Sequence, residues 1–143
     1  MMKAKTFVSF FCISITILFG HRMFSQDKIE IEYDTSHCYS KQMEPRDSVV
    51  LCIECSFKHS AIEIGINSIK YMSDTITTIP TLGVANFVTL PKIDGYEKVG
   101  IRFGPTGFYE FLLDKKYCFI HINYNYDKKK LYLMYTNCEP VYE

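Results

Sequence analysis

Apolar and polar residues alternate with period two over much of the chain, and this alternation predicts half-buried β-strands. One example is the ten-residue segment SVVLCIECSF, residues 48–57. Because successive side chains of a strand point to opposite faces, every second residue of this segment shares one face. That face carries the apolar residues Val49, Leu51, Ile53, Cys55 and Phe57. We expect it to lie in the protein core.

The same alternation recurs along the rest of the chain, with turn-forming residues between the segments. The further expected strands are residues 29–33, 62–66, 87–90, 99–103, 108–113, 117–126 and 131–136. Ile62, Ile66 and Ile69 would also fit one face of a helix, but their β-branched side chains and Gly65 favour a strand. No long amphipathic helix is indicated. The pattern therefore predicts an all-β fold, either an antiparallel sandwich or a small barrel.

Residues 107–122, GFYEFLLDKKYCFIHI, combine a strand that ends in leucine, a tight turn and a second strand that starts with tyrosine. This pattern resembles prealbumin-like and fibronectin-like exported modules, in which the tyrosine often closes a corner. Lys115 and Lys116 stand where those modules have glycine or a proline–glycine pair. The resemblance implies an antiparallel β-sandwich, immunoglobulin-like (Ig-like) or prealbumin-like, of about seven short strands, and no particular function.

The amino-terminal segment has the pattern of an export signal. Lys3 and Lys5 form a positively charged start, and residues 6–20 are an almost uncharged run, shorter than the roughly 20 residues of a membrane span. Residues 1–25 are therefore predicted to be a signal peptide that is cleaved beside Ser25, with Gly20 as the second choice. An uncleaved anchor helix is the alternative.

Cleavage would leave residues 27–143, which we expect to form a single β-sandwich domain. It would be secreted, periplasmic or at the cell envelope, and would contact a membrane only through the signal segment, if that segment were not cleaved. The chain balances 16 lysine and arginine residues against 16 aspartate and glutamate residues. Because these charges are interspersed, no basic face indicates binding of nucleic acid.

Six cysteines are present, and one of them, Cys12, lies in the predicted signal. Cleavage of the signal would leave five cysteines. An odd number of cysteines in an oxidising compartment favours two disulfides and one free thiol. The five candidates are Cys38, Cys52, Cys55, Cys118 and Cys138. Cys55 is expected on the core face of its strand and Cys118 on the same face as Ile120 and Ile122. We therefore expect a bond between Cys55 and Cys118 across the interior, with Cys52 paired to Cys38 or Cys138.

Cys52 and Cys55 also form a C-x-x-C motif, a spacing shared by zinc sites and thiol redox centres. On a strand, two residues three apart point to opposite faces, which disfavours both kinds of site. No second C-x-x-C and no H-x-x-x-H motif completes a zinc site. Structural cysteines are therefore the first expectation, and zinc binding and thiol redox chemistry are the alternatives.

No motif assigns a reaction, and the nucleophile motif G-x-S-x-G is absent. The histidines are more often surface or hydrogen-bonded residues than ligands, and the paired carboxylates could simply face water. These residues are His37, His59 and His121, and Glu30 with Glu32 and Glu54 with Glu63. We expect a protein that is not an enzyme and has no catalytic residue, metal or cofactor. A metal-dependent enzyme is a distant third function.

The last expected hairpin is rich in tyrosine and asparagine, and tyrosine presents an apolar ring with a polar tip. Such side chains can stack on a sugar or contact a protein, although cross-strand aromatic pairs also stabilise a sheet without any ligand. The candidate binding face consists of Asn123, Tyr124, Asn125, Tyr126 and Tyr132.

Two functions follow from these observations. The first is an exported, non-enzymatic β-sandwich protein that binds a protein or glycan partner at the cell envelope, through an edge strand or through the tyrosine face. The second is a small secreted inhibitor or immunity-type protein that acts through a loop stapled by a disulfide between Cys38 and Cys52.

Overall fold

The structure is a computed structural model that describes residues 29–35, 38, 41–44, 46–54, 57–92, 97–105 and 107–142. The predicted signal peptide and its cleavage site lie outside these ranges, as do His37 and Cys55. Within them the chain forms strands and no helix, so this part of the chain contains no helix that could cross a membrane.

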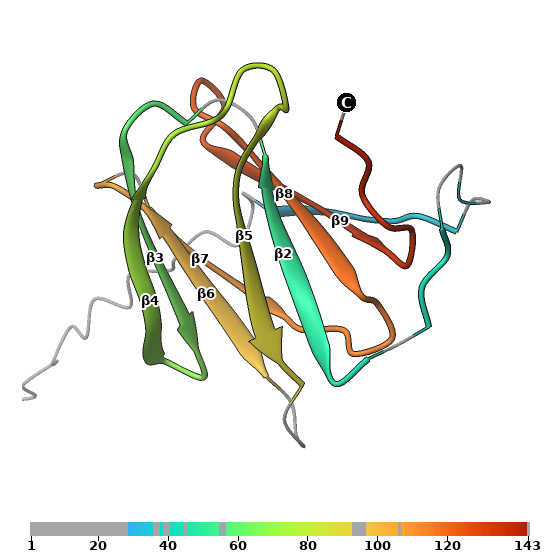
Figure 1. Ribbon diagram of the computed structural model, residues 1–143. Coiled ribbons are helices and arrows are strands. Elements are labelled where there is room, and N and C mark those ends of the chain that lie inside the picture. Colours follow the sequence, from blue (N-terminus) through green and yellow to red (C-terminus); the bar gives the residue numbers. More distant parts are fainter. Residues whose placement is uncertain are drawn as a thin grey trace, which may run out of the picture.

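The described residues form nine strands in two sheets (Figure 1). The larger sheet has five strands in the order β1-β9-β8-β2-β5, and the smaller has four in the order β4-β3-β6-β7. The strand bounds are β1 Ile29–Tyr33, β2 Ser48–Glu54, β3 Ser60–Ile66, β4 Ile69–Ile76, β5 Val84–Pro91, β6 Lys98–Phe103, β7 Phe108–Leu112, β8 Phe119–Asn125 and β9 Lys130–Thr136.

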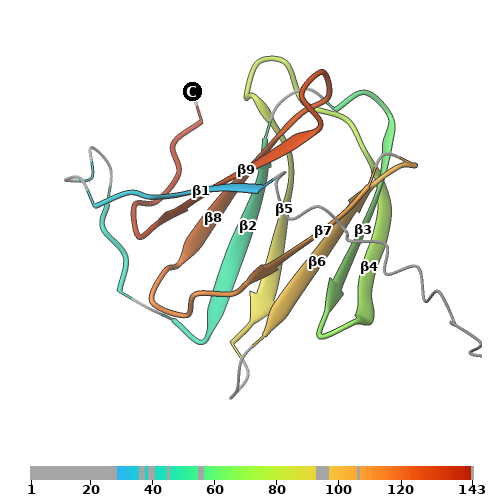
Figure 2. The ribbon, with the colours of Figure 1, turned by 180° about the vertical axis from the view of Figure 1, so that it is seen from behind.

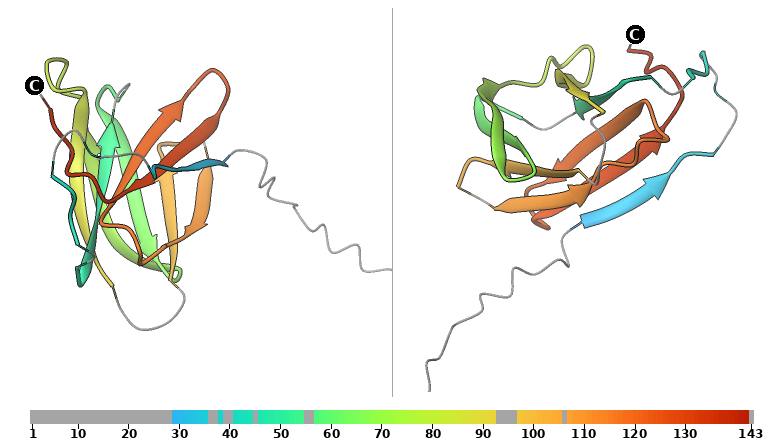
Figure 3. Two further views of the ribbon diagram at one scale, coloured as in Figure 1. Left: turned by 90° about the vertical axis from the view of Figure 1, so that its right-hand side faces the viewer. Right: turned by 90° about the horizontal axis from the view of Figure 1, so that it is seen from below.

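The two sheets enclose one hydrophobic core between them, an arrangement consistent with a β-sandwich (Figure 3). The alternation in the sequence explains which side chains enter this core. Val49, Leu51 and Ile53 point inward from β2 and are fully buried, as predicted. Ile62 and Ile64 of β3 are buried in the same cluster from the smaller sheet. The expectation of an all-β fold is confirmed.

The strand pairing differs from the expected antiparallel arrangement of about seven strands. β4 is a strand that the alternation does not indicate, and two pairs of strands, β1 with β9 and β2 with β8, are parallel. Alternation identifies a strand and its buried face, but it carries no information about the direction of the neighbouring strand. The parallel pairing sets β2 beside a strand from the C-terminal part of the chain.

A tyrosine side chain joins the two sheets at each of their two open sides, and one of these sides also carries a groove. Between β4 and β5, the Tyr71 hydroxyl donates a hydrogen bond to the Thr89 carbonyl oxygen at 3.0 Å and joins the sheets. Between β9 and β7, the Tyr135 hydroxyl donates to the Leu112 carbonyl oxygen at 2.8 Å. On this second side β1 and β7 are the edge strands of their sheets (Figure 2), and a groove lies between them.

The turn between β7 and β8 carries the tyrosine that the sequence resemblance emphasises. The Tyr117 N–H donates to the Asp114 carbonyl oxygen at 3.2 Å, and its side chain packs against the core. The Tyr117 ring lies 5.6 Å from the ring of Tyr33 and 5.7 Å from that of Tyr135. This tyrosine therefore connects the turn to the β1 and β9 side of the larger sheet.

Candidate functional site

A second hydrophobic cluster lies on the outer side of the five-stranded sheet. It consists of Met43, Cys52, Cys118 and Phe119, with Val50 packed against it. Two segments run together beside this cluster, the chain around Met43 and the C-terminal segment, residues 137–142. The Met43 N–H donates to the Asn137 carbonyl oxygen at 2.7 Å, and the Glu139 N–H donates to the Lys41 carbonyl oxygen at 2.9 Å.

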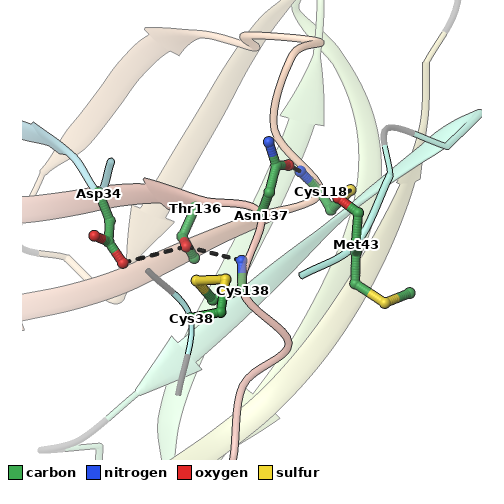
Figure 4. The surroundings of a disulfide bond; sticks show 7 residues. All are labelled: Asp34, Cys38, Met43, Cys118, Thr136, Asn137 and Cys138. Atoms are coloured by element: carbon green, nitrogen blue, oxygen red, sulfur yellow. Dashed lines mark hydrogen bonds between the residues drawn. A yellow bond between two sulfur atoms is a disulfide. The ribbon is translucent and has the colours of Figure 1, made fainter. Parts of the chain in front are cut away.

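A disulfide between Cys38 and Cys138 joins these two segments (Figure 4). Its Cα atoms are 5.2 Å apart, and the two cysteines are separated by 100 residues of sequence. Thr136 supports the bond, because its hydroxyl oxygen accepts the Cys138 N–H at 3.0 Å and its hydroxyl donates to Asp34 Oδ2 at 3.4 Å. The disulfide thus ties the segment after β1 to the segment after β9, the strand with which β1 pairs.

The predicted cysteine pairing is wrong. Cys118 carries a buried free thiol, so the expected bond to Cys55 is not formed, and Cys55 itself lies outside the described residues. Cys118 precedes β8, and its side chain joins the outer cluster instead of following the inward alternation of Ile120 and Ile122. Its N–H donates to Asn137 Oδ1 at 2.8 Å (Figure 4), and its thiol donates to the Glu44 carbonyl oxygen at 3.2 Å.

Cys52 also carries a buried free thiol. It bonds neither Cys38 nor Cys138, which are joined to each other. The stapled loop on which the inhibitor hypothesis depends is therefore not closed by a bond between Cys38 and Cys52. Cys38 bonds to Cys138 instead, which joins the start of this loop to the C-terminal segment.

A cluster of polar side chains lies beside Cys52 on the same outer side. Its centre is Glu54, the last residue of β2, where the register between β2 and β5 shifts. Asn123 Nδ2 donates to Glu54 Oε2 at 2.8 Å, and His121 Nδ1 donates to Glu54 Oε1. The Tyr142 hydroxyl donates to the same Oε1 atom at 3.1 Å. We call Glu54, His121, Asn123 and Tyr142 the Glu54 cluster.

Opposing effects act on the pKa of Glu54. Burial raises the pKa of the carboxyl group, but the hydrogen bond and charge of His121, together with the hydrogen bonds of Asn123 and Tyr142, lower it by more. The net pKa lies below its ordinary value. Glu54 is therefore an ionised carboxylate at neutral pH that holds three donors, one of them on the C-terminal segment.

Cys52 stands next to this cluster, and its strand partner on β8 is His121. A thiol beside an imidazole suggests nucleophilic chemistry. Burial, however, raises the pKa of the Cys52 thiol to about 12, and the thiol hydrogen-bonds the Tyr142 hydroxyl. The Tyr142 ring also packs edge-on against Phe87, with the ring centroids 5.4 Å apart. In this arrangement the cluster fastens the C-terminal segment over a protonated thiol.

The other candidate histidines and carboxylates do not come together. His59 is exposed just before β3, and its N–H donates to Thr77 Oγ1 at 3.0 Å. Glu63 lies on the smaller sheet, so it does not form a carboxylate pair with Glu54 on the larger one. Glu30 forms an ion pair with Lys130. In the described part of the chain, no group of three or more His, Cys, Asp or Glu side chains could hold a metal ion.

The residues of the predicted tyrosine face do not share one face. Tyr124 points into the core, is 3% exposed, and its oxygen accepts the Tyr109 hydroxyl at 3.0 Å. Asn123 points the opposite way into the Glu54 cluster. The alternation of β8 requires this split, because neighbouring residues of a strand point to opposite sides. Asn125 accepts the Lys128 N–H in the following turn, and Tyr126 packs against Tyr124 at 4.8 Å between ring centroids.

Tyr132 is the remaining member of that predicted face. It lies opposite Asn123 in the pairing of β8 with β9. The Lys130 ammonium group lies 5.2 Å from the centroid of the Tyr132 ring. Tyr132 is thus half-buried beside a lysine and does not form an open tyrosine surface with Tyr124.

The outer side of the four-stranded sheet carries a hollow of about 280 Å³. Gly65 and Gly100, which pair between β3 and β6, lie in it. The Phe108 ring covers part of Gly100, because a Cβ atom at that position would lie only 2.4 Å from Phe108 Cζ. Phe108 is nevertheless 44% exposed. We call this feature the glycine hollow.

Charged side chains of both signs border the glycine hollow. Glu63 forms ion pairs with Lys70 at 3.5 Å and with Arg102 at 3.9 Å. The Arg102 guanidinium carbon lies 6.0 Å from the centroid of the Phe108 ring. Glu110 also borders the hollow. The hollow therefore combines an exposed ring, hydrogen-bonding charged groups and two glycines, one of which the Phe108 ring partly covers.

A larger groove of about 740 Å³ lies between β1 and β7. Exposed apolar side chains line it from both sheets: Ile31 is 44% exposed, Tyr33 50% and Leu112 55%. Lys115 and Lys116 from the β7–β8 turn contribute to its lining, and Glu110 borders both this groove and the glycine hollow. We call it the edge groove.

These surfaces could be predicted only in part from the sequence. Gly65 and Gly100 fall on the polar side of two predicted strands, but only the pairing of β3 with β6 sets them opposite each other. The same holds for Glu54 and His121, which meet through the parallel pairing of β2 with β8. The alternation places Glu54 and His121 on the outward faces of their strands. Their contact could have been predicted only if the pairing of these two strands had also been known.

Comparison with protein-family models, with curated proteins and with solved structures found no match to this chain.

Proposed function

We propose that the chain is an exported, Ig-like or prealbumin-like β-sandwich protein that binds an extended segment of a protein partner in the edge groove. The observation that carries this proposal is the exposure of apolar side chains from both sheets along one edge. Single exposed apolar residues are ordinary, but a lined concave groove marks a site of interaction.

The shape and chemistry of the groove favour an extended peptide. β7 is the last strand of its sheet among the described residues, so one of its sides has no neighbouring strand there. Such an edge can pair with an added strand, which binds through its backbone and places alternate side chains into apolar pockets. Leu112 at the end of β7 and Ile31 on β1 would receive those side chains.

Substitution of Leu112 tests this binding mode. Peptides selected from a random displayed library on the purified protein should alternate apolar and polar residues. Leu112→Lys should weaken their binding by about tenfold or more, because it places a charge among the apolar contacts. Ile69→Lys is the matched control, because Ile69 is 73% exposed on β4, away from the groove. Binding would be measured by calorimetry.

Methylation of peptide amides separates strand pairing from simple apolar contact. A selected peptide methylated at alternate backbone nitrogens should lose binding in one register and keep it in the other, because only one set of N–H groups faces β7. Selected peptides that bind Leu112→Lys as tightly as the unchanged protein would exclude the edge groove as the site.

Export rests on the pattern of residues 1–25 and is supported by the disulfide, because disulfides persist in oxidising compartments. Residues 1–30 fused to a reporter that is active only outside the cytosol should confer activity. Sequencing of the mature protein should begin between His21 and Asp27. A mature protein that retains Met1 would contradict cleavage, and an inactive fusion would contradict export.

A further inference from the structure

The glycine hollow lies on the outer side of the smaller sheet and plays no part in the peptide site proposed above. Two glycines face each other there on adjacent central strands, β3 and β6. Glycine inside a strand weakens it, and often marks a place where another group approaches the backbone closely. Gly65 also accommodates the irregular pairing with β4, since a Cβ atom there would lie 3.1 Å from the Ile69 carbonyl oxygen.

Gly100 has a different environment. The three atoms nearest to a Cβ built at this position all belong to the side chain of Phe108. The glycine therefore lets the Phe108 ring settle against the sheet instead of standing away from it. Phe108 thus lines the hollow and is still 44% exposed.

An exposed aromatic ring that is held in place offers an apolar surface for stacking. The C–H groups on one face of a pyranose ring are apolar, and the negative face of an aromatic ring attracts them. The hydroxyl groups at the rim of a sugar need hydrogen-bonding partners. Glu63, Arg102 and Glu110 supply acceptors and donors around the same hollow.

The charges around the hollow decide which kind of sugar fits. Glu63 is balanced by Lys70 and Arg102, and Glu110 is paired with Lys98 at 3.2 Å. The lining of the hollow itself holds two carboxylates, Glu63 and Glu110, and two cations, Lys70 and Arg102. It therefore has no excess of positive charge that would select a phosphate, sulfate or uronic acid group. The volume of about 280 Å³ lies just below the range of about 300–1,000 Å³ for small-molecule sites, which suits a single sugar unit.

From this combination we infer that the glycine hollow binds a neutral sugar unit of a glycan, with Phe108 as the stacking platform and Glu63 and Arg102 as the hydroxyl-binding groups. The site is separate from the peptide site in the edge groove, although Glu110 borders both. The protein would then bind two chemically different ligands at neighbouring sites along β7, one at Phe108 and the other at Leu112.

Amide NMR spectra of the purified protein test this inference. The probes are neutral oligosaccharides of glucose, mannose and N-acetylglucosamine. At least one should shift the amide signals of Gly65 and Gly100, which are easy to assign among only seven glycines. Phe108→Ala should weaken that binding by about tenfold, because it removes the stacking surface.

Two control variants keep the test specific. Phe87→Ala removes an aromatic side chain of similar exposure, 47%, from the larger sheet and should leave sugar binding unchanged. Leu112→Lys should weaken peptide binding in the edge groove by about tenfold or more and leave sugar binding unchanged, so the two proposals can fail separately. Gly100→Ala should weaken sugar binding, because the added Cβ atom displaces the Phe108 ring.

Three results would overturn the inference. The first is that no neutral oligosaccharide shifts the signals of Gly65 and Gly100. The second is that Phe108→Ala binds the sugar as tightly as the unchanged protein. The third is that only anionic glycans bind and that added salt removes their binding, which would show an electrostatic surface in place of a neutral sugar site.

Discussion

Replacing Cys38 and Cys138 together with serine should lower the free energy of unfolding by about 4–5 kcal/mol. The bond closes a loop of 100 residues, and a longer loop loses more entropy in the unfolded chain when it is closed. Because small domains are stable by only about 5–15 kcal/mol, the loss should be a large part of the total. Urea unfolding followed by circular dichroism measures it.

Reduction of the unchanged protein should produce a similar loss, whereas the double serine variant should not respond to reductant. Peptide mapping under non-reducing conditions should show a fragment that links Cys38 to Cys138. A fragment that links Cys55 to Cys118, or Cys52 to Cys55, would contradict the structure on this side of the sheet.

Substitution of Glu54 should have the second largest effect. Glu54→Gln should lower the free energy of unfolding by about 2 kcal/mol at neutral pH, because it weakens charge-assisted hydrogen bonds to a group that is only 20% exposed. Glu63→Gln is the matched control. Glu63 is 45% exposed in its ion pairs, so its loss should change stability by less than about 0.5 kcal/mol.

The effect of Glu54 should depend on pH with a definite sign. Its pKa is lower in the folded protein than in the unfolded chain, where it is about 4.3. Its contribution to stability is therefore fully present above about pH 5 and is lost as the pH falls through the folded pKa. The difference in stability between the unchanged protein and Glu54→Gln should shrink below pH 4. A difference that stays constant down to pH 3 would contradict the depressed pKa.

Loss of the Glu54 carboxylate should also loosen the C-terminal segment, because Tyr142 donates to it. The Cys52 thiol lies under Tyr142, so Glu54→Gln should react faster with a thiol reagent at this cysteine than the unchanged protein does. Cys118 serves as the internal reference, since its thiol is held by the Glu44 carbonyl oxygen, away from the Glu54 cluster.

The sequence by itself determined the all-β class and most of the core. Val49, Leu51 and Ile53 are buried as their alternation predicts, and so are Val99, Ile101 and Phe103 of β6. Burial of every second residue is a local property of a strand, so a single segment is enough to show it. β4 escaped prediction because nearly all of its residues are exposed or half-exposed, which leaves no apolar face for alternation to show.

Strand partners were decided by the tertiary structure alone. The pairing of β2 with β8 brings Glu54 to His121 and Asn123, and the pairing of β3 with β6 brings Gly65 to Gly100. The disulfide partner of Cys38 depends in the same way on the parallel neighbours β1 and β9. These contacts join residues that are far apart in the sequence. The alternation within a strand does not depend on which strand lies beside it or on the direction of that neighbour, so it cannot predict such contacts.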